Sequence, residues 1–167
     1  MANYDVLCFL EYFADRSNVL DASDKRAATY QWQNFYQEGQ TLSVDSDASG
    51  IYYYLAFNAD GFGSSEAAGI NDLKVSLAAT AEIVDITETA MGADNLVIAS
   101  LYIQDAGSSS LDAGSAQLIA RYTGSIVGAS IGDESAEWTV NPAINKIKAQ
   151  APTRVISTDL IGRFDVP

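Results

Sequence analysis

The sequence has 167 residues, of which 48% are hydrophobic and 19% are charged, and its formal net charge is −13 at pH 7. This length suits one domain with its own core, and the composition excludes a wholly disordered chain. The charge argues against a nucleic-acid partner, since such binding relies on Lys and Arg, and against an acidic membrane surface.

The charge is unevenly spread along the chain. The last 22 residues carry four basic and two acidic side chains, so they sum to +2 and the remaining residues to −15. We therefore predict a β-rich globular domain over residues 1–145 and an extended C-terminal segment over residues 146–167 that docks onto neighbouring subunits. The alternative is a solvated tail without a partner.

The N-terminal stretch predicts a protein that is made in a cytoplasm. It lacks the basic region of a signal peptide, and no apolar run reaches the roughly 18 residues that span a bilayer. Residues 6–13 form an apolar and aromatic run that predicts a strand. The single cysteine, Cys8, lies in this run, and we expect it to pack in the core.

The next segments alternate between strand patterns and turn patterns. Residues 29–36 predict a half-buried strand with Tyr30, Trp32 and Tyr36 on one face. The turn sequence DSDASG precedes a second aromatic strand at residues 51–57. Residues 58–72 then predict a long loop with Phe62 as the bulky residue at its tip.

The middle of the chain predicts a β–helix–β unit. Leu73, Val75 and Leu77 alternate with polar residues, as in a strand with one buried face. After Thr80, a plausible N-cap, apolar residues recur at helical spacing until Gly92, a plausible stop signal. The predicted buried face of this helix consists of Ile83, Val84, Thr87, Ala90 and Met91. Residues 96–103 predict the second strand.

The last part of the domain continues the β pattern. Residues 105–116 predict a second flexible loop, and the following 24 residues predict two or three short strands, broken at Gly124 or Gly128 and at a turn over residues 132–135. Residues 153–164 predict either a final strand on the sheet or an extension to a neighbour. The predicted fold class is mainly β, a β-sandwich or barrel-like domain with one short helix.

Residues that could support catalysis are few. The sequence has no histidine, which excludes Ser-His-Asp and Cys-His arrangements and histidine metal sites. Nucleophilic catalysis would have to use a Ser–Lys pair or a carboxylate, and no motif supports either. Asp133, Glu134 and Glu137 beside Trp138 resemble a glycosidase acid/base pair near a sugar platform, but the acidic composition accounts better for this cluster. We predict no catalytic residues.

Three further patterns suggest binding sites. Asp45, Asp47, Ser49 and Gly50 match the first half of an EF-hand loop, but Ala56 stands where the bidentate Glu belongs, so an Asx-type turn explains them better than a cation site. Gly61 and Gly63 do not complete a dinucleotide-binding motif. The aromatic set could line a carbohydrate groove, although a core or a subunit interface uses the same residues: Tyr30, Trp32, Tyr36, Tyr52, Tyr53 and Tyr54. We predict no cofactor and no metal.

The order of segments from Tyr52 onward resembles the N-terminal domain of the minor tail protein L and tail-tip hub family of lambda-like tailed bacteriophages. The matching segments, in order, are YYYLAFNADGF, LKVSLA, AEIVDITETAM, LVIASLYIQD, ARYTGSIVGASI and AEWTV. The family has arginines after the fourth segment, where this chain has Gln104 and Asp105, and longer members continue into a cysteine-rich region that this chain lacks.

The resemblance implies a structural protein that is not an enzyme. It implies a virion component at the distal tail, hub or baseplate that assembles as a ring of identical copies and contacts other phage tail proteins. The alternative from a different class is a small non-catalytic β-sandwich module that binds carbohydrate or calcium.

Overall fold

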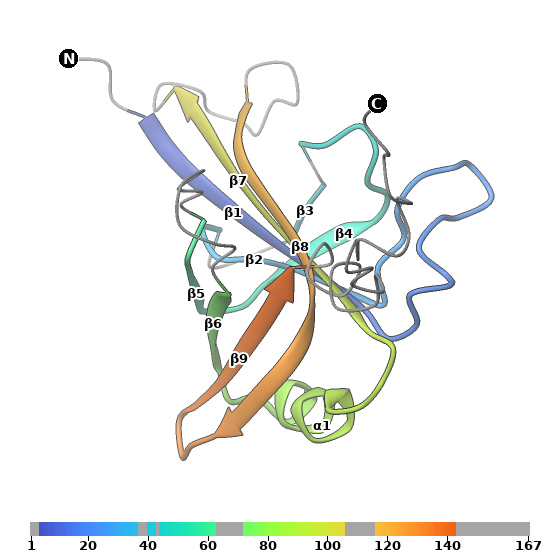
Figure 1. The fold of residues 1–167 in the computed structure, drawn as a ribbon. Helices are drawn as coiled ribbons and strands as arrows, with labels where there is room; N and C mark the ends of the chain where they lie inside the picture. The colour runs from blue at the N-terminus through green and yellow to red at the C-terminus, as the bar shows by residue number, and fades with distance from the viewer. Residues whose placement is uncertain (1–3, 37–39, 43, 63–71, 106–115, 143–167) are drawn as a thin grey trace, which may run out of the picture.

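The computed structural model describes residues 4–36, 40–42, 44–62, 72–105 and 116–142 (Figure 1). The predicted C-terminal segment at 146–167 and most of the two predicted loops lie outside these residues. The elements within them are β1 Tyr4–Phe13, β2 Tyr30–Gln33, β3 Gln40–Leu42, β4 Ile51–Tyr54, β5 Phe57–Asp60, β6 Leu73–Ala78, α1 Ala81–Ala90, β7 Leu96–Asp105, β8 Gln117–Ile131 and β9 Ser135–Pro142.

The described strands form one mixed sheet with the order β3-β4-β2-β1-β7-β8-β9-β6-β5. The β2–β4 pair is parallel and the other pairs are antiparallel. The prediction of a mainly β domain with one short helix is therefore confirmed. The sheet is not closed.

The sheet curls strongly, so that strands near its two ends approach each other. β4 and β5 lie near opposite ends of the strand order, yet only Leu55 and Ala56 separate them in the chain. The side chain of Asn34, just after β2, donates a hydrogen bond of 3.2 Å to the carbonyl of Phe57 on the far edge strand. The segment predicted as one strand at residues 51–57 is thus two strands, because the chain crosses between the ends of the sheet at Leu55.

β8 is the longest strand and joins the two halves of the sheet. Residues 117–124 pair with β7, and residues 124–131 pair with β9. The predicted break at Gly124 or Gly128 is wrong, because β8 stays extended through both residues. The pairing with β7 and then with β9 contains bulges at Leu101/Tyr102 and Ile126/Gly128. A Cβ atom on Gly124 would lie 2.3 Å from the Asn141 carbonyl, so glycine permits this close approach. The predicted turn at 132–135 is confirmed by a hydrogen bond of 2.7 Å from Gly132 N–H to the Ser135 carbonyl.

The main core lies between the two halves of the curled sheet. Leu10, Trp32, Val75 and Trp138 come from both halves and are buried there. From Leu7 to Phe13, β1 is buried on both faces, since chain segments around Val44 and Val19 cover its other side. Cys8 lies in the main core, as the sequence predicts, and burial raises the pKa of its thiol to about 12.

Helix α1 covers one end of the β8–β9 hairpin (Figure 1). The Thr80 hydroxyl accepts a hydrogen bond of 3.3 Å from Ile83 N–H, and Gly92 has φ of +86°, so both predicted end signals are confirmed. The predicted buried face is partly wrong. Ile86 is buried, whereas Met91 is 52% exposed because it follows the last helical residue.

Candidate functional site

β1, β7 and β8 extend together at one end of the molecule (Figure 1). Apolar side chains of β1 and β8 are exposed at this end. Tyr4 and Val6 are 56% and 59% exposed, although Cys8, two residues further along the same face of β1, is only 5% exposed. Leu118 and Ile119 of β8 are also exposed. We call Tyr4, Val6, Leu118 and Ile119 the ribbon end. It is a continuation of core-forming strands that no described segment covers.

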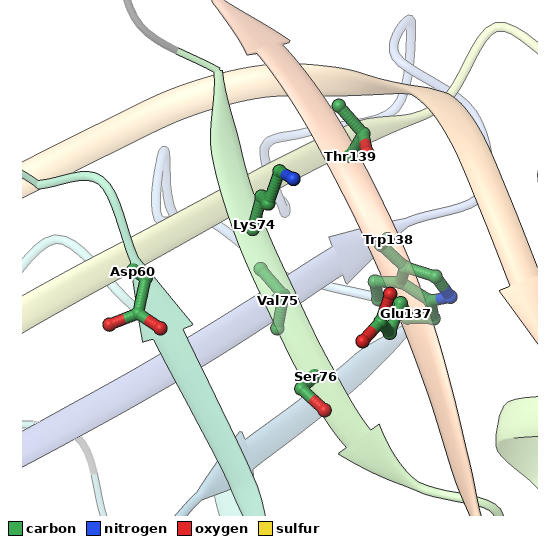
Figure 2. A pocket seen from close by; sticks show the side chains of 7 residues that line it. All are labelled: Asp60, Lys74, Val75, Ser76, Glu137, Trp138 and Thr139. Atoms are coloured by element: carbon green, nitrogen blue, oxygen red, sulfur yellow. The ribbon is translucent and has the colours of Figure 1, made fainter.

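A polar hollow lies on the outer face of β5, β6 and β9 and has a volume of about 190 Å³. Figure 2 shows this layer in front of strands from the other half of the sheet, which cross behind it. The strand register places Lys74 beside Asp60 and Thr139, and Ser76 beside Glu137. Opposed residues of antiparallel strands have Cβ atoms roughly 4.5–5.5 Å apart, so an ammonium group and two carboxylates share this surface.

The hollow is smaller than the roughly 300–1,000 Å³ of typical ligand pockets, so it suits one side chain of a protein partner or a small polar group. Lys74 and Ser76 lie on one face of β6, but among the described residues no hydrogen bond joins the ammonium to the hydroxyl. The Ser–Lys pairing that nucleophilic catalysis would need is therefore not made here.

The acidic cluster noted in the sequence is divided by the fold. Glu137 and Trp138 are neighbours on β9 (Figure 2), but Glu137 lies on the outer face whereas Trp138 is buried in the core. There the Trp138 indole N–H donates a hydrogen bond of 2.8 Å to the Thr87 hydroxyl. Asp133 and Glu134 lie in the exposed turn between β8 and β9. A sugar platform built on Trp138 beside Glu137 is thus not formed, because successive residues of a strand point to opposite faces.

A carboxylate–arginine network lies on the other half of the sheet, and it consists of Glu11, Arg26, Asp45 and Arg121. Arg26 donates hydrogen bonds of 3.1 Å to Glu11 and 2.7 Å to Asp45, and Arg121 also pairs with Asp45. Tyr52 donates to Glu11, which is only 2% exposed. The network holds the segments around residues 26 and 45 against the sheet. The sequence could not reveal it, because its members lie far apart in the chain.

The network determines whether Asp45, in the EF-hand-like sequence, is available to bind a cation. Although burial raises the pKa of Asp45, hydrogen bonds from Arg26 and from Asp47 N–H outweigh this effect and lower the pKa below its ordinary value. The Asp45 carboxylate is occupied by two guanidinium groups, and its other oxygen accepts from Asp47 N–H at 3.0 Å. This is the Asx-type turn that the sequence favours, and it leaves Asp45 unsuited to bind a cation.

The predicted aromatic groove does not form as one surface. Trp32 and Tyr52 are buried, Tyr30 packs against the core, Tyr54 is partly buried, and Tyr36 and Tyr53 are exposed. Phe62, predicted at a loop tip, packs against the main core. Gly61 has φ of +110° and a Cβ there would lie 2.8 Å from the Asp72 carbonyl, so a tight backbone approach explains this glycine. Gly63 lies outside the described residues.

In the described ranges, no three acidic or cysteine side chains come together as metal ligands. The same ranges contain no helix with the length and apolar character that crossing a membrane requires. Comparison with known proteins finds no family that the chain matches and no curated protein similar to it.

Proposed function

We propose that this protein is a structural subunit that works by binding other copies of itself and neighbouring proteins in an assembly. The assembly we propose is the virion of a tailed bacteriophage, at the distal tail, hub or baseplate. The observation that carries the proposal is the ribbon end, where Tyr4 and Val6 are more than half exposed on a core-forming face.

The energetics of the ribbon end favour a protein partner. Fully burying an apolar side chain of this size contributes roughly 1.5–3 kcal/mol. Tyr4 and Val6 lie on one face of this end, and the strand register puts Leu118 on the opposite face, beside Tyr102. The buried centre of an interface between subunits is more apolar than the rest of the surface and enriched in aromatic residues such as Tyr.

The order of the elements supports the phage part of the proposal. The resemblance implies a hairpin, a strand, a short helix, a further strand and finally paired strands. From the first of these single strands onward the chain agrees, since β6, α1, β7 and the β8–β9 hairpin follow one another, whereas the segment matched to the hairpin forms β4 and β5, which do not pair with each other. The agreement concerns the succession of elements and not residue identity. It supports a tail component without any catalytic role.

Light scattering after size-exclusion chromatography at several concentrations tests the assembly. We expect the molar mass to rise to a multiple of 17.8 kDa, and we expect Val6→Lys to weaken this association because it places a charge in the apolar contact. Met91→Lys is the matched control, because Met91 is 52% exposed and follows helix α1, which lies away from the exposed ends of β1 and β7 (Figure 1).

A molar mass of one chain at every concentration would overturn the assembly proposal. The phage assignment has a separate test in the genes that flank this one. Genes for other tail proteins are expected beside it, and a locus without virion genes would contradict the assignment while leaving self-assembly intact.

A further inference from the structure

Among the described strands, β8 has an unpaired edge in the middle of the strand order. Its first half pairs with β7 on one side, and its second half pairs with β9 on the other side. Each half of β8 therefore has one edge that pairs with a neighbouring described strand and one edge that does not. In the second half, that edge is partly satisfied by Asn95, whose side-chain oxygen accepts a hydrogen bond of 2.9 Å from Ile126 N–H. In the first half, none of the described strands pairs with the β9-side edge of residues 117–121.

This edge differs from the two outer edges of the sheet. The outer edge strands β3 and β5 have only three and four residues, and short edge strands are a common protection against unwanted pairing. The β8 edge belongs to a 15-residue strand and carries Leu118 and Ile119, which are 43% and 52% exposed. An added strand would find both backbone partners and apolar side chains here.

The continuation of β9 is a poor candidate to fill this edge. β9 ends at Pro142, whose register partner on β8 is Gly124, just beyond the C-terminal end of the open edge. A strand that continued past this point would hold proline in its interior, where its missing N–H and fixed φ disfavour pairing. Proline at this position argues against β9 itself extending along the edge.

We propose that this β8 edge binds residues 153–164 of a second copy of the chain as an added strand. The inference rests on the proposed assembly and identifies the surface through which two copies would bind. Residues 153–164 read TRVISTDLIGRF, which is rich in β-branched and apolar residues. They belong to the segment with a charge of +2, whereas the rest of the chain sums to −15, and Asp5 and Asp105 are exposed at the same end of the sheet on β1 and β7, across β8 from this edge.

Disulfide trapping between full-length chains tests the proposal. One chain carries Ile119→Cys and the other carries Leu160→Cys, and the two are mixed and oxidised. Cys8 can stay in place, since its buried thiol has a pKa raised to about 12 and reacts slowly. We expect a disulfide-linked dimer of the two different chains. The matched control replaces Ile119→Cys by Val127→Cys, which lies on the half of β8 that pairs with β9. We expect no disulfide-linked dimer with this control.

The outcomes separate this proposal from the proposed function. An internal disulfide at the mass of one chain, in a variant that carries both cysteines, would show that the segment folds back on its own chain and would overturn the proposal. Assembly of the unmodified protein without any trapped dimer would also overturn it and leave the proposed function standing. A protein that is monomeric at all concentrations overturns both.

Discussion

Trp32 and Trp138 lie with their ring centroids 6.3 Å apart, although three strands separate their own strands β2 and β9 in the sheet. Four steps of about 4.8 Å would place them roughly 19 Å apart in a flat sheet. The contact therefore measures how far the sheet curls. It makes one sheet enclose its own core, as two packed sheets do in a sandwich.

The hydrogen bond between Trp138 and Thr87 joins this core to helix α1. Thr87→Val keeps the side-chain shape but leaves the buried indole N–H without its acceptor, which costs about 1–3 kcal/mol. Urea unfolding should show this loss. Thr89→Val on the exposed side of the same helix is the control and should change the free energy of unfolding by less than about 0.5 kcal/mol. Equal effects of both substitutions would contradict the structural role of Thr87.

Arg26 neutralises two carboxylates that the fold holds close together. Arg26→Met removes this cation and leaves the buried Glu11 without its ion pair, so we expect a loss of about 3–5 kcal/mol in the free energy of unfolding. Lys25→Met, at the exposed neighbouring position, should stay within about 0.5 kcal/mol of the unmodified protein. A loss below 1 kcal/mol for Arg26→Met would show that the network does not stabilise the fold.

The lowered pKa of Asp45 predicts how stability depends on pH. Because the folded-state pKa lies below the ordinary value of 3.8, the unfolded chain binds this proton first. The stabilisation is present above about pH 4 and is lost as the pH falls through the folded-state pKa. Asp45→Asn should therefore lower stability at pH 7 and make the decline on acidification shallower. Chemical denaturation at a series of pH values from 7 to 2 measures the free energy of unfolding of both proteins. If the two free energies fell in parallel with pH, this prediction would be refuted.

Gly124 and Gly128 offer a comparison within one strand. Gly124→Ala would place its methyl group against the Asn141 carbonyl and force β8 and β9 apart, at a cost of about 1–3 kcal/mol. The nearest atom to a Cβ on Gly128 is 3.5 Å away, which is an ordinary contact, so Gly128→Ala should be nearly neutral. Thermal unfolding of the two variants checks this order, and a larger shift for Gly128→Ala would contradict the geometry.

The sequence by itself determined most of the elements. The alternation of Leu73, Val75 and Leu77 identifies β6 because a strand with one buried face has a period of two residues. Thr80 and Gly92 mark the ends of α1 because capping chemistry is local. A predicted strand was too long where a side chain, and not a neighbouring strand, accepts the backbone hydrogen bonds. The strand predicted through Tyr36 ends at Gln33, whose side-chain oxygen accepts hydrogen bonds from Phe35 and Tyr36 N–H.

Only the tertiary structure decided which of these elements share a surface. Glu11, Arg26, Asp45 and Arg121 meet through segments that are distant in the chain, and no local pattern encodes that meeting. β8 stays one strand through Gly124 because β7 and β9 pair with it in succession. The exposure of the ribbon end likewise depends on which strands extend beyond the buried core. Local patterns follow from backbone geometry and capping, whereas strand order, curl and exposed surface follow from long-range pairing that the burial of a common core selects.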